Sequence, residues 1–143
     1  MARSRVIPGR YCAVQYAAFN PATQRMSFSH AGLPLPLLIS AGGCVEVGEG
    51  GLPSGLFPHA EYVDSSLELA AGDSILFSTD GIAEARNSKD EEFGIERIIE
   101  VCAAHRSKHA DELLAAIAAA LDDFTNGTRQ HDDMSAAVLK VIG

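Results

Sequence analysis

The sequence predicts an α+β fold in which helices pack on antiparallel β-sheets. In the first half of the chain, short apolar segments alternate with turn signals, as is typical of strands joined by hairpins. In the second half, the apolar residues change to helical spacing over two adjacent segments, and one last apolar strand follows. Helices and strands do not alternate along the chain, so a parallel α/β sheet is not expected.

Six strands are expected before the helices. They are rich in apolar, β-branched and aromatic residues, and glycine, proline or asparagine separates them. In one of them Met26 and Phe28 alternate with polar residues, which places both on one face. The glycine-rich residues 48–58 are expected to form a loop. The expected strands are residues 11–19, 25–30, 35–40, 44–47, 61–69 and 74–78.

The helical part begins with residues 95–105, in which Ile95, Ile98 and Cys102 recur at helical spacing. A second helix is expected over residues 111–124, with an apolar stripe on one face. The dipeptide at 126–127 is Asn-Gly, which commonly ends a helix. Residues 134–142 complete the fold as a largely buried strand. No repeat or linker divides the chain, which predicts a single domain over residues 1–143.

The composition excludes several classes of protein. The 143 residues include 11 Lys and Arg against 19 Asp and Glu, a formal charge of −8, which argues against nucleic-acid binding. No window is long and apolar enough to cross a membrane, and the first ten residues do not form a signal peptide. An apolar fraction of 47% makes a disordered chain improbable.

The cysteines indicate a reducing compartment. Cys12, Cys44 and Cys102 are odd in number and far apart in the sequence. A disulfide framework or structural zinc site is therefore not expected. The simplest interpretation is a cytoplasmic protein with reduced thiols.

Two acidic positions could carry chemistry. Asp80 directly follows the apolar strand at 74–78 and precedes a glycine, so it could hold a cation at the strand end or form an ordinary Asp-Gly turn. Asp132 and Asp133 stand just before the last strand, where they could face a cation or be solvated. If the two strands are neighbours in one sheet, the carboxylates converge and offer hard oxygen ligands for Mg²⁺ or Mn²⁺.

Four segments resemble one family. Residues 78–87, with Glu-Phe-Gly at 92–94, are similar to the central motif of the PPM metal-dependent serine/threonine phosphatases, in particular the stage II sporulation E (SpoIIE-type) branch. Residues 131–135 resemble the C-terminal metal motif of that family. Residues 29–38 and 51–56 resemble two further segments of it, and all four occur in the family order.

The resemblance implies a PPM-type αββα sandwich and hydrolysis of phosphoserine or phosphothreonine by a metal-bridging water. It makes Asp80 and Asp132 the catalytic metal ligands, Gly81 part of the same metal site, and Asp133 an outer or additional weak ligand. Mn²⁺ or Mg²⁺ is the implied cofactor.

The sequence departs from the family pattern at two places. The front half of the family domain, with an Asp-x-x-Gly-His-Gly type motif, has no counterpart here, so the domain is expected to be truncated. The usual histidine after Ala-Gly is Leu33, although His30 precedes it by three residues.

A truncated sandwich would expose sheet edges and part of a core, so a homodimer is expected to complete it. Further ligands could then come from His30, His59, His131 or Glu84, and histidine ligands would also suit Zn²⁺. A surface or capping role remains the alternative for each histidine.

These observations leave three hypotheses. The first is a metal-dependent phosphoric-ester hydrolase that acts on a phosphoprotein or a small phosphate ester. The second is a PPM-like remnant without catalysis that serves as a binding or regulatory module. The third is that the chain is a segment of a longer enzyme. We favour the hydrolase because both acidic motifs are present.

Overall fold

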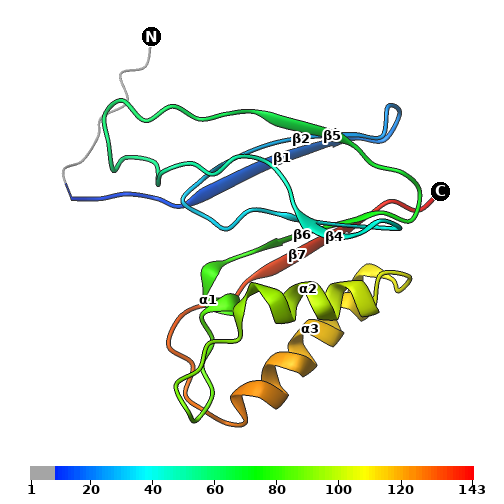
Figure 1. Ribbon diagram of the computed structural model, residues 1–143. Coiled ribbons are helices and arrows are strands. Elements are labelled where there is room, and N and C mark those ends of the chain that lie inside the picture. Colours follow the sequence, from blue (N-terminus) through cyan, green and yellow to red (C-terminus); the bar gives the residue numbers. More distant parts are fainter. Residues whose placement is uncertain (1–8) are drawn as a thin grey trace. The chain divides into compact units, whose positions relative to one another are not determined.

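The computed structural model describes residues 9–143, which form two compact units. The first unit contains the strands β1 (Val14–Asn20), β2 (Arg25–Ala31) and β5 (Ser65–Glu68). These strands form an antiparallel sheet in the order β1-β2-β5 (Figure 1). β1 is an edge strand of this sheet.

The hairpin between β1 and β2 follows the predicted turn. The side-chain oxygen of Asn20 accepts hydrogen bonds from the backbone N–H groups of Ala22 (3.0 Å) and Thr23 (3.3 Å). Within β2, Met26 and Phe28 are buried while Ser27 between them is exposed, which confirms that Met26 and Phe28 share one face.

The second unit comprises Pro36–Val47 and Leu69–Gly143. Its four strands pair antiparallel in the order β4-β3-β6-β7. Figure 1 shows the two long helices, α2 and α3, on the same side of this sheet, so the prediction of adjacent helices before the last strand is confirmed. The elements are β3 (Leu37–Ser40), β4 (Gly43–Glu46), β6 (Ser74–Ser78), α1 (Asp80–Ala83), α2 (Gly94–Ala104), α3 (Ala110–Thr125) and β7 (Ala136–Lys140).

The core of the second unit lies between its sheet and its helices. Ile98 and Cys102 of α2 are buried at the predicted helical spacing, and Leu113, Ile117 and Leu121 of α3 are buried with them. The other buried members of this core are Leu37, Ile39, Leu76, Ile82, Ala85 and Phe93.

An aromatic contact ties the start of α2 to the end of α3. The Phe93 and Phe124 rings meet edge to face with their centroids 5.3 Å apart. The guanidinium of Arg97 lies 4.6 Å from the Phe124 ring centroid and donates a hydrogen bond to the Phe93 carbonyl (2.7 Å). These contacts hold the loop that follows α1 against the helices.

Local interactions determine where α3 begins and where it ends. At the start, the His109 backbone N–H donates to the Glu112 carboxylate (3.0 Å), and this bond lowers the pKa of Glu112. At the end, Asn126 adopts a left-handed conformation with φ +44°, which stops the helix as its Asn-Gly sequence predicts.

The three cysteines are free thiols, as expected. Cys44 of β4 packs against the core that contains Cys102 of α2. Interaction with the Cys44 thiol, together with burial, raises the pKa of Cys102. Cys102 is therefore held as the neutral thiol.

The structure differs from the sequence prediction at three elements. β5 is shorter than predicted because residues 61–64 have no ladder partner. The last strand is less buried than predicted, since β7 lies at the edge of its sheet. Asp80–Ala83 forms the short helix α1, where an Asp-Gly turn was the alternative interpretation. Within residues 9–143, no helix is both long and apolar enough to span a membrane.

The first prediction concerns the core of the second unit. Replacing Ile98, which is 1% exposed, with alanine should lower the free energy of unfolding by about 2–5 kcal/mol, because the cavity left among the helices and sheet cannot fully collapse. Ile142 is 77% exposed, so Ile142→Ala serves as the control and should change it little. Denaturant unfolding measures both, and an equal effect of the two substitutions would contradict this description of the core.

Candidate functional site

The candidate site lies where β6 ends and β7 begins. The two strands are hydrogen-bonded neighbours, with Ser78 opposite Ala136. Beyond this pair, Thr79 continues the connection: its backbone N–H donates to the Ser135 carbonyl (3.0 Å), and its hydroxyl accepts from the Ser135 N–H (3.0 Å). The acidic residue after β6 and those before β7 therefore lie together where these two paired strands end and begin.

Three carboxylates meet at these strand ends. Asp80 is the first residue of α1, and Glu84 follows one helical turn later on the same side. Asp132 approaches from the loop after α3. One oxygen from each of the three lies within 4.8 Å of the others, and all three side chains are exposed.

A glycine makes this approach possible. A Cβ atom on Gly81 would collide with the Asp133 carbonyl oxygen. The Thr79 hydroxyl also lies 3.3 Å from the same carbonyl oxygen and donates to it. The backbone of the 132–133 segment thus rests directly on the first turn of α1, and any larger residue at position 81 would push it away.

The loop orients Asp132 through its own hydrogen bonds. The backbone N–H of Asp133 donates to one carboxylate oxygen of Asp132 (2.7 Å), and the Gln130 side-chain amide donates to the Asp132 carbonyl (2.7 Å). A carboxylate has about four lone-pair positions, so Asp132 retains capacity for another partner.

A cavity of about 440 Å³ opens beside the carboxylates. Glu84 and Asp132 form part of its wall, and Arg129 and His131 form another part. Its remaining lining comes from α1, from the end of α3 and from the loop between α3 and β7. The cavity lies entirely within the second unit.

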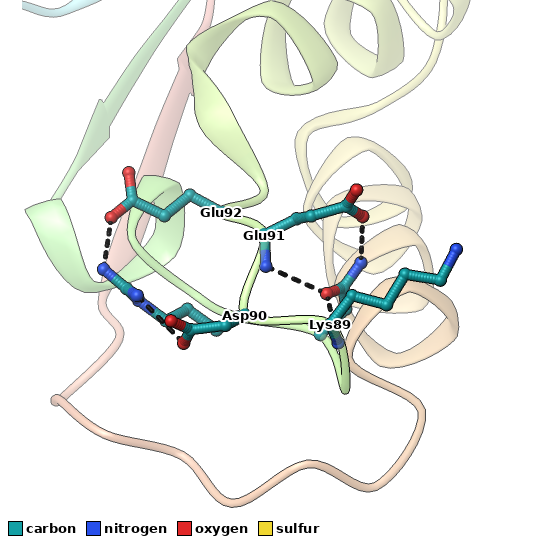
Figure 2. A network of polar contacts seen from close by, with 6 residues as sticks. Lys89, Asp90, Glu91 and Glu92 are labelled. Carbon is teal, nitrogen blue, oxygen red and sulfur yellow. Dashed lines mark hydrogen bonds and ion pairs between the residues drawn. The ribbon is translucent and has the colours of Figure 1, made fainter.

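Figure 2 shows a polar loop that follows α1, and Arg86 at the start of this loop also lines the cavity. Arg86 bonds Asp90 (2.9 Å) and Glu92 (2.8 Å) through its two terminal nitrogens. Because these ion pairs are exposed, they are worth little individually, but together they fix one guanidinium geometry.

Asn87 holds the same loop closed. Its side-chain oxygen accepts from the backbone N–H groups of Lys89 (2.9 Å) and Glu91 (3.0 Å), and its amide donates to the Glu91 carboxylate (2.7 Å). Figure 2 shows these contacts around the turn. The Arg-Asn pair of the recognised motif therefore has a structural role.

The carboxylate trio fits a hard divalent cation. Oxygen ligands at about 2.1 Å from an octahedral ion lie roughly 3 Å apart when adjacent and about 4.2 Å apart when opposite. The trio, with its oxygens within 4.8 Å of one another, needs only small side-chain movements to reach those separations. Three carboxylates and no nitrogen or sulfur ligand suit Mg²⁺ or Mn²⁺ better than Zn²⁺.

The other residues singled out in the sequence lie at different places. Gly81 and His131 line the cavity, and Asp133 turns its carbonyl toward Gly81. His30 belongs to the first unit, where it is 4% exposed, stacks on Phe28, and has no hydrogen-bond partner for either ring nitrogen among residues 9–143. It is not a member of the trio.

The two arginines that line the cavity could not be predicted from the sequence. Arg86 lay inside a recognised motif without a role, and Arg129 lay in a loop with no motif at all. No local pattern tells which surface arginine will border a cavity built from three separate segments.

Comparison with known proteins gives one family. The family model of "Stage II sporulation protein E (SpoIIE)" matches residues 2–142. Among curated proteins, Protein IcfG from Synechocystis sp. is 26% identical over 126 residues, which make up 87% of this chain and 20% of IcfG. The chain thus spans about a fifth of the length of that relative.

Solved structures share the fold. The phosphatase domain of the cell fate determinant SpoIIE from Bacillus subtilis, presoaked with Mn, matches 91% of this chain and 56% of its own chain, with a TM-score of 0.73 and 15% identity. The catalytic domain of the serine/threonine protein phosphatase PstP in complex with two manganese ions matches 92% and 59%, with a TM-score of 0.58 and 15% identity. The predicted α+β fold with antiparallel sheets is therefore confirmed as that of these phosphatase domains.

The second prediction concerns the contact between α1 and the loop before β7. Gly81→Ala should weaken binding of Mn²⁺ by about tenfold or more, because the added methyl group displaces the Asp133 carbonyl and Asp132 with it. Gly42→Ala is the control, since a Cβ there would meet only the Ser40 hydroxyl at 3.6 Å. Calorimetric titration measures both variants. Equal affinities in the two would show that the close approach at Gly81 does not position the site.

Proposed function

Since the chain belongs to the stage II sporulation protein E (SpoIIE) family, we propose that it forms part of a metal-dependent phosphatase domain that hydrolyses phosphoric esters. The observation that carries the proposal is the carboxylate trio of Asp80, Glu84 and Asp132 beside a cavity of about 440 Å³. We propose that residues 1–143 make up a single domain of this type, shorter than the matched phosphatase structures.

The residues of the site have distinct roles in this proposal. Asp80 and Asp132 hold Mn²⁺ or Mg²⁺, Glu84 adds a third carboxylate, and the Gly81 carbonyl and Asp133 complete the surroundings. When bound, such a cation lowers the pKa of water and stabilises negative charge on phosphoryl oxygens. The chain contributes by bringing three carboxylates together where β6 ends and β7 begins, so that less reorganisation is needed during the reaction.

The phosphatase relatives support a phosphoprotein as the substrate, and a small phosphate ester is the other candidate. PstP is a serine/threonine protein phosphatase whose catalytic domain binds two manganese ions. The trio accounts for ligands to one cation, and a second one requires donors beyond these three residues.

A non-catalytic module that retains the family fold is the alternative function. Against it stand three exposed carboxylates in one place, which repel one another and of which none forms an ion pair within 4.0 Å among residues 9–143. The two functions differ in whether the site binds a cation.

We also propose a homodimer in a cytoplasmic setting. Among residues 9–143, β1 is an edge strand of its sheet, and Val14 and Tyr16 on it are 47% and 69% exposed. A second copy that pairs along this edge would cover both features. The three free thiols support a reducing compartment.

The third prediction tests the metal centre and the activity together. Asp80→Asn should lower the affinity for Mn²⁺ by about tenfold or more and abolish Mn²⁺-dependent hydrolysis of p-nitrophenyl phosphate, because it removes one of three anionic ligands. Asp123→Asn removes the same charge from the exposed surface of α3 and should leave both unchanged. Calorimetry measures the affinity for Mn²⁺, and absorbance measures the hydrolysis of p-nitrophenyl phosphate.

The outcomes separate the two functions. Binding of Mn²⁺ with turnover that depends on Asp80 supports the hydrolase. Failure of the wild-type chain to bind millimolar Mn²⁺ would favour the non-catalytic module. Equal turnover by the wild type and Asp80→Asn would exclude this site as the active site.

The fourth prediction concerns the dimer. Tyr16→Asp should convert a dimer into a monomer, because a charge on the edge strand opposes pairing with another copy. Ile142→Asp places the same charge at an exposed position of the second unit and should leave the dimer intact. Light scattering after size-exclusion chromatography reports both masses, and a wild-type monomer would contradict the proposed dimer.

A further inference from the structure

The cavity beside the carboxylate trio is lined by both acidic and basic residues. Glu84, Asp122 and Asp132 line it, and so do Arg86 and Arg129, which come from two different loops. A volume of about 440 Å³ lies within the usual range for sites that bind small molecules. A phosphate group fills only part of such a space, which leaves room for the rest of an ester.

The two arginines differ in how their charges are used. Arg86 is bonded to Asp90 and Glu92, so two carboxylates already balance its charge. Among residues 9–143, Arg129 has no carboxylate within 4.0 Å and makes no side-chain hydrogen bond. Arg129 is therefore the guanidinium at this cavity that remains available to a ligand.

A structural explanation for Arg129 must also be considered. The cavity adjoins the end of α3, and a positive charge near a helix C-terminus is favourable because it opposes the helix dipole. This stabilisation depends only on the positive charge, so a lysine at position 129 would provide it equally well. Recognition of a phosphate group by a guanidinium is different, because its planar donors can form two parallel hydrogen bonds to two phosphate oxygens.

We propose that Arg129, which lines the same cavity as Glu84 and Asp132, binds the phosphate group of the substrate. The inference rests on the proposed function, since the trio with its cation and Arg129 would bind different oxygens of the same group. A phosphate monoester suits such a cavity because it offers oxygens to a hard cation and to a guanidinium at once. Arg129 is thus a substrate-binding residue, and its removal weakens phosphate binding without removing the cation.

Phosphate binding can be measured apart from turnover. Inorganic phosphate is titrated into the Mg²⁺-loaded chain and followed by phosphorus NMR, with Mg²⁺ affinity measured separately by calorimetry. Arg129→Ala should weaken phosphate binding about tenfold or more, as expected for loss of a charge-assisted, two-point contact. Arg129→Lys should recover only part of the affinity, because an ammonium group cannot make the paired contact. Both variants should retain wild-type affinity for Mg²⁺.

Lys108→Ala provides the control for net charge. Lys108 precedes α3, whereas the cavity lies at the other end of this 16-residue helix, about 24 Å away along its axis. The Lys108→Ala variant should bind phosphate with the same affinity as the wild type. Equal affinities in Arg129→Ala and the wild type would overturn the inference, as would full recovery by lysine.

The same measurements distinguish this inference from the proposed function. Normal Mg²⁺ binding without any phosphate binding would overturn the role of Arg129 and leave the metal centre standing. Absence of Mg²⁺ binding in the wild type would overturn the metal centre, and the role of Arg129 with it.

Discussion

The pairing of β6 with β7 is the constraint on which the candidate site depends. In an antiparallel pair, the end of one strand lies beside the start of the other. Asp80 and Asp132, more than fifty positions apart in sequence, therefore meet at the ends of these strands. Thr79 extends this pairing through Ser135, and Gly81 lets the segment before β7 rest on α1. The carboxylates of Asp80 and Asp132 then converge, with oxygens within 4.8 Å of each other.

The rest of the second unit supports the ends of β6 and β7 that carry the site. The helices α2 and α3 bury the sheet face behind it, and the contact between Phe93 and Phe124 anchors the loop that leaves α1. The ion pairs of Arg86 and the hydrogen bonds of Asn87 close that loop beside the cavity. Such a rigid frame around exposed carboxylates suits a site whose function is to hold a charged ligand in a fixed geometry.

Much of this arrangement could be predicted from sequence because the signals are local. Period-two alternation located β2, helical spacing located α2 and α3, and the acidic residues next to β6 and β7 indicated where a cation would bind. Properties set by tertiary neighbours could not be predicted in the same way. The exposure of β7 follows from its position at the sheet edge, and the place of Arg129 follows from the junction of three segments. The recognised motif at 78–87 also gave no indication that Arg86 and Asn87 mainly shape a loop.

The proposed activity depends on a cation between Asp80, Glu84 and Asp132. The most direct test is a crystal of this chain soaked in Mn²⁺ and measured for anomalous scattering. We expect an anomalous peak about 2.2 Å from carboxylate oxygens of Asp80 and Asp132, with Glu84 beside it. A peak bound only elsewhere on the chain, or none at these carboxylates at saturating Mn²⁺, would contradict it.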